Sequence, residues 1–313
     1  MKRVLAALLM VLAAGCGASG PGGRVEAAWG HPGKEAGNFV KPRGLAVDPA
    51  RGLVYVADMS GRIQKFTLDG GFLASWELPD TALGTSEGMA VTSAGELLVA
   101  DTHYHRILRY NPQGEPLRGF GERGEGPGQL LFPVAIALDA AGDVFVAGYG
   151  DNRVQKFDPQ GRYLLGWGSL GKAEGQFARP SGLAVERDGN VLVADAANHR
   201  IQRFTPQGRF LAAWGRFGTA PGELHYPYDV AALGDGTVAV AENYNHRIQR
   251  FSADGRPLGG IGRPGRESGE FARPWCLAVG PAGTLYVTDT LNHRVQVLRL
   301  PAAALGRLAA GGG

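Results

Sequence analysis

Asp229 and Cys276 are the residues whose types could most readily support chemistry, because a carboxylate and a thiol can bind metal ions or exchange protons. Each is the first residue of a short apolar segment. Four similar segments elsewhere in the chain begin with a small residue instead: Gly44, Gly88, Ala135 and Gly182. A zinc site needs about three protein ligands, and none of these six positions carries histidine. We therefore expect no cofactor and no bound metal, with Asp229 as a weak candidate ligand, and we interpret Cys276 as a small buried thiol.

Aromatic and charged residues in the turns beside these apolar runs form a second group of candidates. Tyrosine and tryptophan supply much of the binding energy at protein and sugar interfaces. We predict a binding surface made by the following side chains: Arg43, Glu87, His103, Tyr149, Tyr228, Asp229, Tyr244 and Trp275. The alternative is a metal-dependent lyase or hydrolase that relies on Asp229, Arg43 and Glu87. Either interpretation needs a fold that carries these distant turns to one place.

A repeated pattern along the chain predicts that fold. An acidic residue recurs after 43 and then every 47 residues, with glycine in one copy: Asp58, Asp101, Gly148, Asp195, Glu242 and Asp289. An arginine follows in each copy: Arg62, Arg106, Arg153, Arg200, Arg247 and Arg294. Two patterns that stay in phase indicate six copies of one structural unit.

Each copy is expected to contain four short strands separated by Gly and Pro turns, as at 182–185, 191–194, 200–204 and 210–214. Such units bury their faces by stacking around an axis, which predicts an all-β six-bladed β-propeller over residues 24–300. The sixth copy lacks a fourth strand. Because RVEAAW at 24–29 matches FLAAW at 210–214, we predict that this N-terminal strand completes the last blade and closes the ring. The Ala- and Gly-rich residues 301–313 form a separate tail.

The turns between the second and third strands resemble those of NHL repeats. The resemblance rests on DTHYHR (101–106), DAANHR (195–200), ENYNHR (242–247) and DTLNHR (289–294), and it covers nearly all of residues 24–300. It implies a six-bladed propeller, and NHL proteins act mainly as interaction platforms. A related lyase branch uses zinc held by histidines at the entrances of the inner strands. Those entrances carry no histidine here.

The repeated polar residues are interpreted as scaffold, because a catalytic site needs one constellation and not six copies. We expect the acid and the arginine of each blade to pair, since buried charges survive only when paired. The residue before the arginine is histidine in four copies, namely His105, His199, His246 and His293. Six-fold geometry places neighbouring copies about 60° apart, so these histidines cannot share one metal. The third copy has Gly148 and Asn152 instead, and Asp151 can replace its missing acid.

The first residues have the layout of an export signal. Lys2 and Arg3 precede an apolar run at 4–14, and AAGC at 13–16 resembles the lipobox of bacterial lipoproteins, in which the cysteine is acylated. This predicts a signal peptide at 1–15, lipidation at Cys16 and an anchored linker at 16–23. By the same resemblance, Gly17 predicts sorting to the outer membrane of the bacterial cell envelope, with the lipid as the one contact to the membrane.

Charge excludes one class of partner. The formal net charge is +3 and no run of Lys or Arg is present, so nucleic acid is not expected to bind. The 50 glycines among 313 residues fit a protein with many turns. Together these observations predict a lipid-anchored propeller that serves as a binding or scaffold platform, whose aromatic channel mouth recognises a protein, peptide or glycan.

Overall fold

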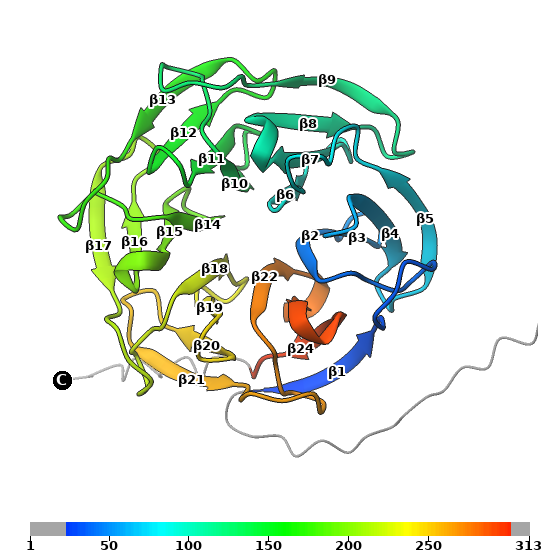
Figure 1. Cartoon of the computed structure of the whole chain (residues 1–313). Helices are drawn as coiled ribbons and strands as arrows, with labels where there is room; N and C mark the ends of the chain where they lie inside the picture. Colours follow the sequence, from blue (N-terminus) through cyan, green and yellow to red (C-terminus); the bar gives the residue numbers. More distant parts are fainter. Residues whose placement is uncertain (1–22, 302–313) are drawn as a thin grey trace, which may run out of the picture.

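The computed structural model describes residues 23–301, which form six four-stranded antiparallel sheets arranged in a ring (Figure 1). Each sheet is one blade of a propeller. The predicted all-β, six-bladed β-propeller is therefore confirmed. The predicted signal peptide, Cys16, most of the linker and most of the tail lie outside the described residues. No helix among residues 23–301 is long and apolar enough to cross a membrane.

The strands follow one another outward from the axis in the first five blades. Blade 1 contains β2 (Pro42–Asp48), β3 (Leu53–Asp58), β4 (Arg62–Thr67) and β5 (Phe72–Glu77). Blade 2 contains β6 (Met89–Val91), β7 (Leu97–Asp101), β8 (Arg106–Tyr110) and β9 (Pro116–Phe120). Blade 3 contains β10 (Pro133–Leu138), β11 (Val144–Gly148), β12 (Arg153–Phe157) and β13 (Tyr163–Trp167).

The remaining blades repeat this order with one exception. Blade 4 contains β14 (Pro180–Val185), β15 (Val191–Asp195), β16 (Arg200–Phe204) and β17 (Phe210–Trp214). Blade 5 contains β18 (Pro227–Ala232), β19 (Val238–Glu242), β20 (Arg247–Phe251) and β21 (Pro257–Ile261). Blade 6 contains β22 (Pro274–Val279), β23 (Thr284–Asp289), β24 (Arg294–Arg299) and, as its outer strand, β1 (Arg24–Trp29). Short 3-10 turns are η1 (Thr102–Tyr104), η2 (Ala196–Asn198), η3 (Pro281–Gly283) and η4 (Thr290–Asn292).

The ring is closed by the N-terminal strand, as predicted. Strand β1 pairs antiparallel with β24, and Trp29 lies opposite Val295. The Trp29 indole contacts Tyr286 of blade 6 at a ring-centroid distance of 6.0 Å and Phe66 of blade 1 at 6.3 Å. One side chain therefore packs against both blades that meet at the closure.

The core consists of six apolar clusters, one between each pair of neighbouring blades. Strand β3 shows how one strand serves two clusters. Val54 and Val56 pack toward blade 6, whereas Tyr55 and Ala57 pack toward blade 2, because successive side chains of a strand point to opposite faces. This explains the uninterrupted apolar runs, which are buried on both faces.

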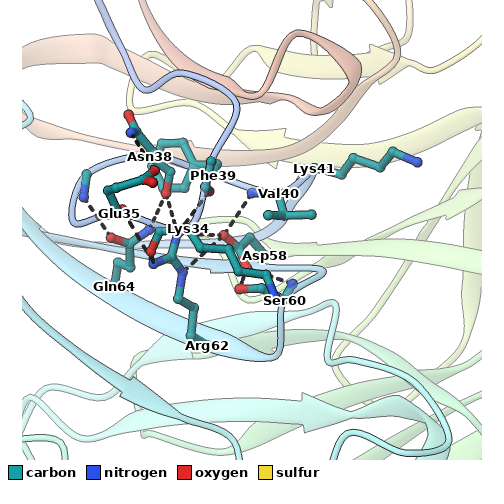
Figure 2. A network of polar contacts seen from close by, with 12 residues as sticks. Lys34, Glu35, Asn38, Phe39, Val40, Lys41, Asp58, Ser60, Arg62 and Gln64 are labelled. Atoms are coloured by element: carbon teal, nitrogen blue, oxygen red, sulfur yellow. Dashed lines mark hydrogen bonds and ion pairs between the residues drawn. The ribbon is translucent and has the colours of Figure 1, made fainter.

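The repeated acid and arginine fasten the long loop between blades to the sheet that follows it. In blade 1, the Val40 amide donates to Asp58 Oδ2 at 3.0 Å, and Arg62 Nη2 donates to the Asn38 carbonyl at 2.6 Å (Figure 2). Gln64 Nε2 donates to the same Asn38 carbonyl at 2.7 Å. These contacts satisfy polar groups of a loop that has no regular structure.

An acid pairs with the arginine in every blade, at N–O distances of 2.5–3.4 Å. Blade 3 achieves this with Asp151, which lies 2.8 Å from Arg153. A Cβ atom on Gly148 would lie 2.1 Å from the Asp151 carboxylate, so this carboxylate fills the place of the missing acid. The repeated acids and arginines therefore belong to the scaffold.

The repeated histidine is a latch between blades. In four blades its Nδ1 accepts a hydrogen bond from a backbone N–H at the entrance of the next blade: His105 from Phe132 (3.0 Å), His199 from Tyr226 (3.1 Å), His246 from Arg273 (3.1 Å) and His293 from Lys41 (3.2 Å). Asn152 does the same in blade 3, where its Oδ1 accepts from Arg179 at 2.9 Å. An accepting Nδ1 must be unprotonated, so each latch requires a neutral ring.

These latches predict a loss of stability in mild acid. Burial lowers the pKa of His105, His199 and His246 below the ordinary value of 6.5. The unfolded chain then binds more protons than the folded chain, so stability present above about pH 6.5 is lost as the pH falls through the folded pKa values. His199→Asn should keep the hydrogen bond from the Tyr226 N–H, as Asn152 does in blade 3. The free energy of unfolding of this variant should then fall less than that of the wild type as the pH is lowered. His199→Ala should cost about 1 kcal/mol at pH 7.5. An equal fall in the free energy of unfolding below pH 6.5 in wild type and His199→Asn would contradict the latch.

Candidate functional site

The two ends of the central channel differ in the side chains that line them. One end is lined by Leu, Ala, Val and Met side chains of the inner strands. The other end, where the inner strands begin, opens into a polar pocket of about 270 Å³, here called the mouth pocket. Seven residues predicted from the sequence line it: Arg43, Glu87, His103, Tyr149, Tyr228, Tyr244 and Trp275. Polar recognition is therefore possible at this end.

Four of these residues form a connected group on the pocket floor. Arg43 Nη1 donates to Glu87 Oε1 at 3.0 Å, and the Tyr228 hydroxyl donates to Glu87 Oε2 at 2.7 Å. The Arg43 guanidinium lies 4.3 Å from the ring centroid of Trp275, which lies 4.0 Å from that of Tyr228. Arg43, Glu87, Tyr228 and Trp275 come from blades 1, 2, 5 and 6, so the ring itself assembles the group.

The charges of this floor group compensate one another. Glu87 is 8% exposed, and a carboxylate buried to this degree needs a charged partner, which Arg43 supplies. Burial, followed by the Glu87 charge, raises the pKa of Tyr228 well above its ordinary value. Tyr228 is thus a neutral phenol that donates to Glu87. Because Glu87 engages Arg43 and Tyr228 together, it serves to position both side chains.

Asp229 and Cys276 lie deeper, beside a cavity of about 50 Å³ in the channel. Asp229 is 7% exposed, and its two oxygens accept the backbone N–H groups of Val230 (2.9 Å) and Leu277 (2.8 Å). Burial raises the pKa of Asp229 to about 7, although the two hydrogen bonds act in the opposite direction and lower it. Burial and the nearby Asp229 carboxyl raise the pKa of the Cys276 thiol. Cys276 is thus a protonated thiol rather than a thiolate nucleophile.

The donor set of the channel does not fit a zinc ion. Within residues 23–301, no group of three or more His, Cys, Asp and Glu side chains could hold a metal. Asp229 directs both oxygens at main-chain amides, and Gly182 lacks a side chain because a Cβ there would lie 2.5 Å from the Asp229 carboxylate. Asp229 therefore joins blade 4 to blade 6 through close packing.

His103 and Tyr149 line the side of the mouth pocket formed by blades 2 and 3. Both rings pack against Phe132, at centroid distances of 6.1 Å for His103 and 5.7 Å for Tyr149. Tyr244, from the loop after β19, lies on the side of blade 5, where its ring stacks on His225 at 5.0 Å. The three residues are thus held by other rings, with Tyr149 and Tyr244 partly exposed.

The sequence prediction missed the outer rim of the pocket, which includes Arg179, Tyr226 and Arg273. Each residue directly precedes the proline that opens an inner strand, and each has a positive φ of 55–57°. Proline restricts the φ and ψ angles of the residue before it, and a positive φ is costly for a residue other than glycine. The positive φ of these three residues must therefore be stabilised by other contacts. The latches of the preceding blades supply these contacts, through Asn152, His199 and His246. The repeated X-Pro dipeptide was the available sequence signal.

The NHL repeat family model matches residues 177–204, 224–251 and 271–298, in blades 4, 5 and 6. A search of curated proteins finds no match. Among solved structures, a streptogramin B lyase is 14% identical, with a TM-score of 0.61 over 87% of this chain and 96% of the other. A gluconolactonase from Xanthomonas campestris is 16% identical, with a TM-score of 0.63 over 89% and 91%. A nidogen/laminin complex is 20% identical, with a TM-score of 0.56 over 70% and 79%.

At these identities the solved structures share the fold alone, and that fold occurs in enzymes as well as in the nidogen/laminin complex. The repeat match and the six described blades agree on the architecture. The chain is a six-bladed β-propeller in which three blades match the NHL repeat.

Proposed function

We propose that this propeller is a binding platform whose partner, a protein, peptide or glycan, docks in the mouth pocket. One contrast carries the proposal. The residues that recur from blade to blade are engaged in pairing and latching, whereas the residues that differ between blades gather in this pocket. Loops on a rigid scaffold that vary while the scaffold repeats are the usual location of binding residues.

The proposal includes a location. Acylation of Cys16 would hold the propeller at the bacterial cell envelope, on the outer membrane, with the lipid as its one membrane contact. Labelling of cells with a radioactive fatty acid tests this, because Cys16→Ser should abolish incorporation. Incorporation that survives Cys16→Ser would contradict lipidation at this residue.

A metal-dependent lyase or hydrolase in the channel is the alternative function. The observation that favours it is Asp229, whose pKa of about 7 suits proton exchange near neutral pH. Against it, both Asp229 oxygens accept main-chain N–H groups, and Glu87 is held by Arg43 and Tyr228. Stoichiometric zinc or calcium in the purified protein, lost in Asp229→Ala, would support the enzyme over the platform.

Site-specific photocrosslinking tests the binding platform. A photoreactive phenylalanine at Tyr244, which is 44% exposed beside the pocket, should trap a partner in cells. The matched control is Tyr163, which is 38% exposed on the outer strand of blade 3. Adding Tyr226→Ala should abolish the Tyr244 adduct while the melting temperature changes by only about 2–4 °C. The same adducts from both positions would contradict a partner at the mouth pocket.

A further inference from the structure

Arg179 and Arg273 are the two arginines of the mouth pocket that have no carboxylate within ion-pair distance among residues 23–301. The third arginine of the pocket, Arg43, is already paired with Glu87. The Arg179 guanidinium lies 5.6 Å from the ring centroid of Tyr149, and that of Arg273 lies 5.1 Å from that of Tyr244. A guanidinium over a ring can still present N–H groups to an anion. Arg179 also forms a side-chain hydrogen bond with Tyr226.

Both arginines start from a backbone that is fixed before any ligand arrives. Their φ angles are 56° and 57°, and their amides are held by Asn152 and His246 across the joint between blades. Strained backbone that the surroundings enforce is concentrated at functional sites. The latches therefore fix the positions from which these two side chains enter the pocket.

A continuous row of rings leads from the outer surface to the pocket between these arginines, and we call it the aromatic strip. It consists of Phe217, His225, Tyr244 and Tyr226, with successive centroid distances of 4.9, 5.0 and 5.4 Å. Phe217 is 64% exposed at the outer end, and Tyr226 lies 6.2 Å from Tyr228 at the inner end. An exposed Phe linked to a polar pocket marks an interaction surface.

The pocket also has buried donors without acceptors. Within residues 23–301, Arg43 Nε and Trp275 Nε1 are buried and have no hydrogen-bond partner. Both side chains line the mouth pocket. Buried donors in native proteins are normally satisfied, so an acceptor supplied from outside the chain is expected here. A ligand rich in oxygen acceptors would meet these donors and the two guanidinium groups that have no carboxylate partner.

We propose that the mouth pocket and the aromatic strip bind an extended acidic peptide, with carboxylates on Arg179 and Arg273 and an apolar side chain on Phe217. This inference rests on the proposed function and specifies its partner. Arginine and carboxylate form paired, charge-assisted hydrogen bonds, which give both affinity and orientation. The peptide approaches along the strip and places its acidic part over the pocket.

The ring faces favour a peptide over a glycan. Sugars bind aromatic residues mainly through open ring faces, but the Tyr244 ring stacks on His225 and also carries Arg273, while Tyr149 carries Arg179. The open apolar surface is that of Phe217, at the outer end of the strip. The exposed Phe217 is thus separate from the arginines of the pocket. A peptide can reach both, because it carries apolar and acidic side chains at different positions.

Selection from a phage library of random heptapeptides against the purified full chain tests the proposal. Enriched peptides should be rich in Asp and Glu and should contain an apolar residue. In Arg179→Gln/Arg273→Gln, their affinity should fall by about tenfold per arginine, and the wild-type affinity should fall with added salt. Phe217→Ala should weaken binding without changing this salt dependence.

The matched control is Arg162→Gln/Arg263→Gln, which removes two exposed arginines outside the pocket and should leave affinity unchanged. Circular dichroism melts establish that both double variants are folded. Enriched peptides without acidic residues, or equal affinity for both double variants, would overturn the acidic peptide. Binding of an oligogalacturonate with no enriched peptide would also overturn it, in favour of a glycan. Neither result would remove the photocrosslink at Tyr244, which tests the platform separately.

Discussion

Deletion of β1 (Arg24–Trp29) is expected to lower the melting temperature by roughly 10–20 °C, more than removal of any one core side chain. The deletion removes every backbone hydrogen bond between β1 and β24, and it leaves β24 as an open edge. It also removes Trp29 from its contacts with Phe66 and Tyr286. Because these two rings belong to blades 1 and 6, the ring loses its closing contact as well as a strand.

Three further variants separate closure from ordinary packing. Trp29→Ala and Trp214→Ala remove equivalent indoles from the outer strands of blades 6 and 4, and each should cost about 3–5 kcal/mol. The β1 deletion should exceed both, because only it opens the ring. Deletion of residues 302–313 should leave the melting temperature almost unchanged. A β1 deletion no more costly than this tail deletion would refute closure by the N-terminal strand.

The repeat made the architecture predictable. Residues 24–29 could be assigned to the last blade because their sequence matches an outer strand while the sixth copy lacks one, and β1 pairs with β24 as expected. The mouth residues could be grouped because equivalent loops of a propeller emerge on one face. A period of about 47 residues thus carries three-dimensional information that single strands do not.

The details of the pocket were less accessible, since they depend on contacts between blades. Arg43 pairs with Glu87 of the next blade, and Tyr228 reaches the same carboxylate from across the ring. Arg179 and Arg273 occupy the same repeat position, directly before the proline of an inner strand. In blades 3 and 5 this position holds Phe132 and Tyr226, so the residue types do not reveal that the position recurs. Its geometry comes from latch bonds between residues 27 positions apart.

Asp229→Ala is expected to remove a loss of stability that the wild type shows between acid and alkaline solution. The pKa of Asp229 is raised by burial from 3.8 to about 7, so the folded chain binds a proton that the unfolded chain releases. Stability from this proton is complete below pH 3.8 and is lost as the pH rises through 7. Between pH 5 and pH 8.5 the wild type should therefore lose roughly 3 kcal/mol relative to the variant. Denaturant unfolding at both pH values measures this difference.

The variant is conservative, because Ala135 occupies the equivalent position in blade 3. Loss of the bonds to Val230 and Leu277 lowers the stability of Asp229→Ala at both pH values, so the change with pH, and not the absolute value, reports the carboxyl group. Cys276→Ala keeps Asp229 but removes a thiol hydrogen bond that lowers its pKa, so this variant should lose at least as much stability as the wild type between pH 5 and pH 8.5. The histidine latches act with the opposite sign below about pH 6.5, so the wild type should be most stable at intermediate pH. Parallel curves for wild type and Asp229→Ala would mean that Asp229 is ionised throughout, and its oxygens would then be charged acceptors for the two amides.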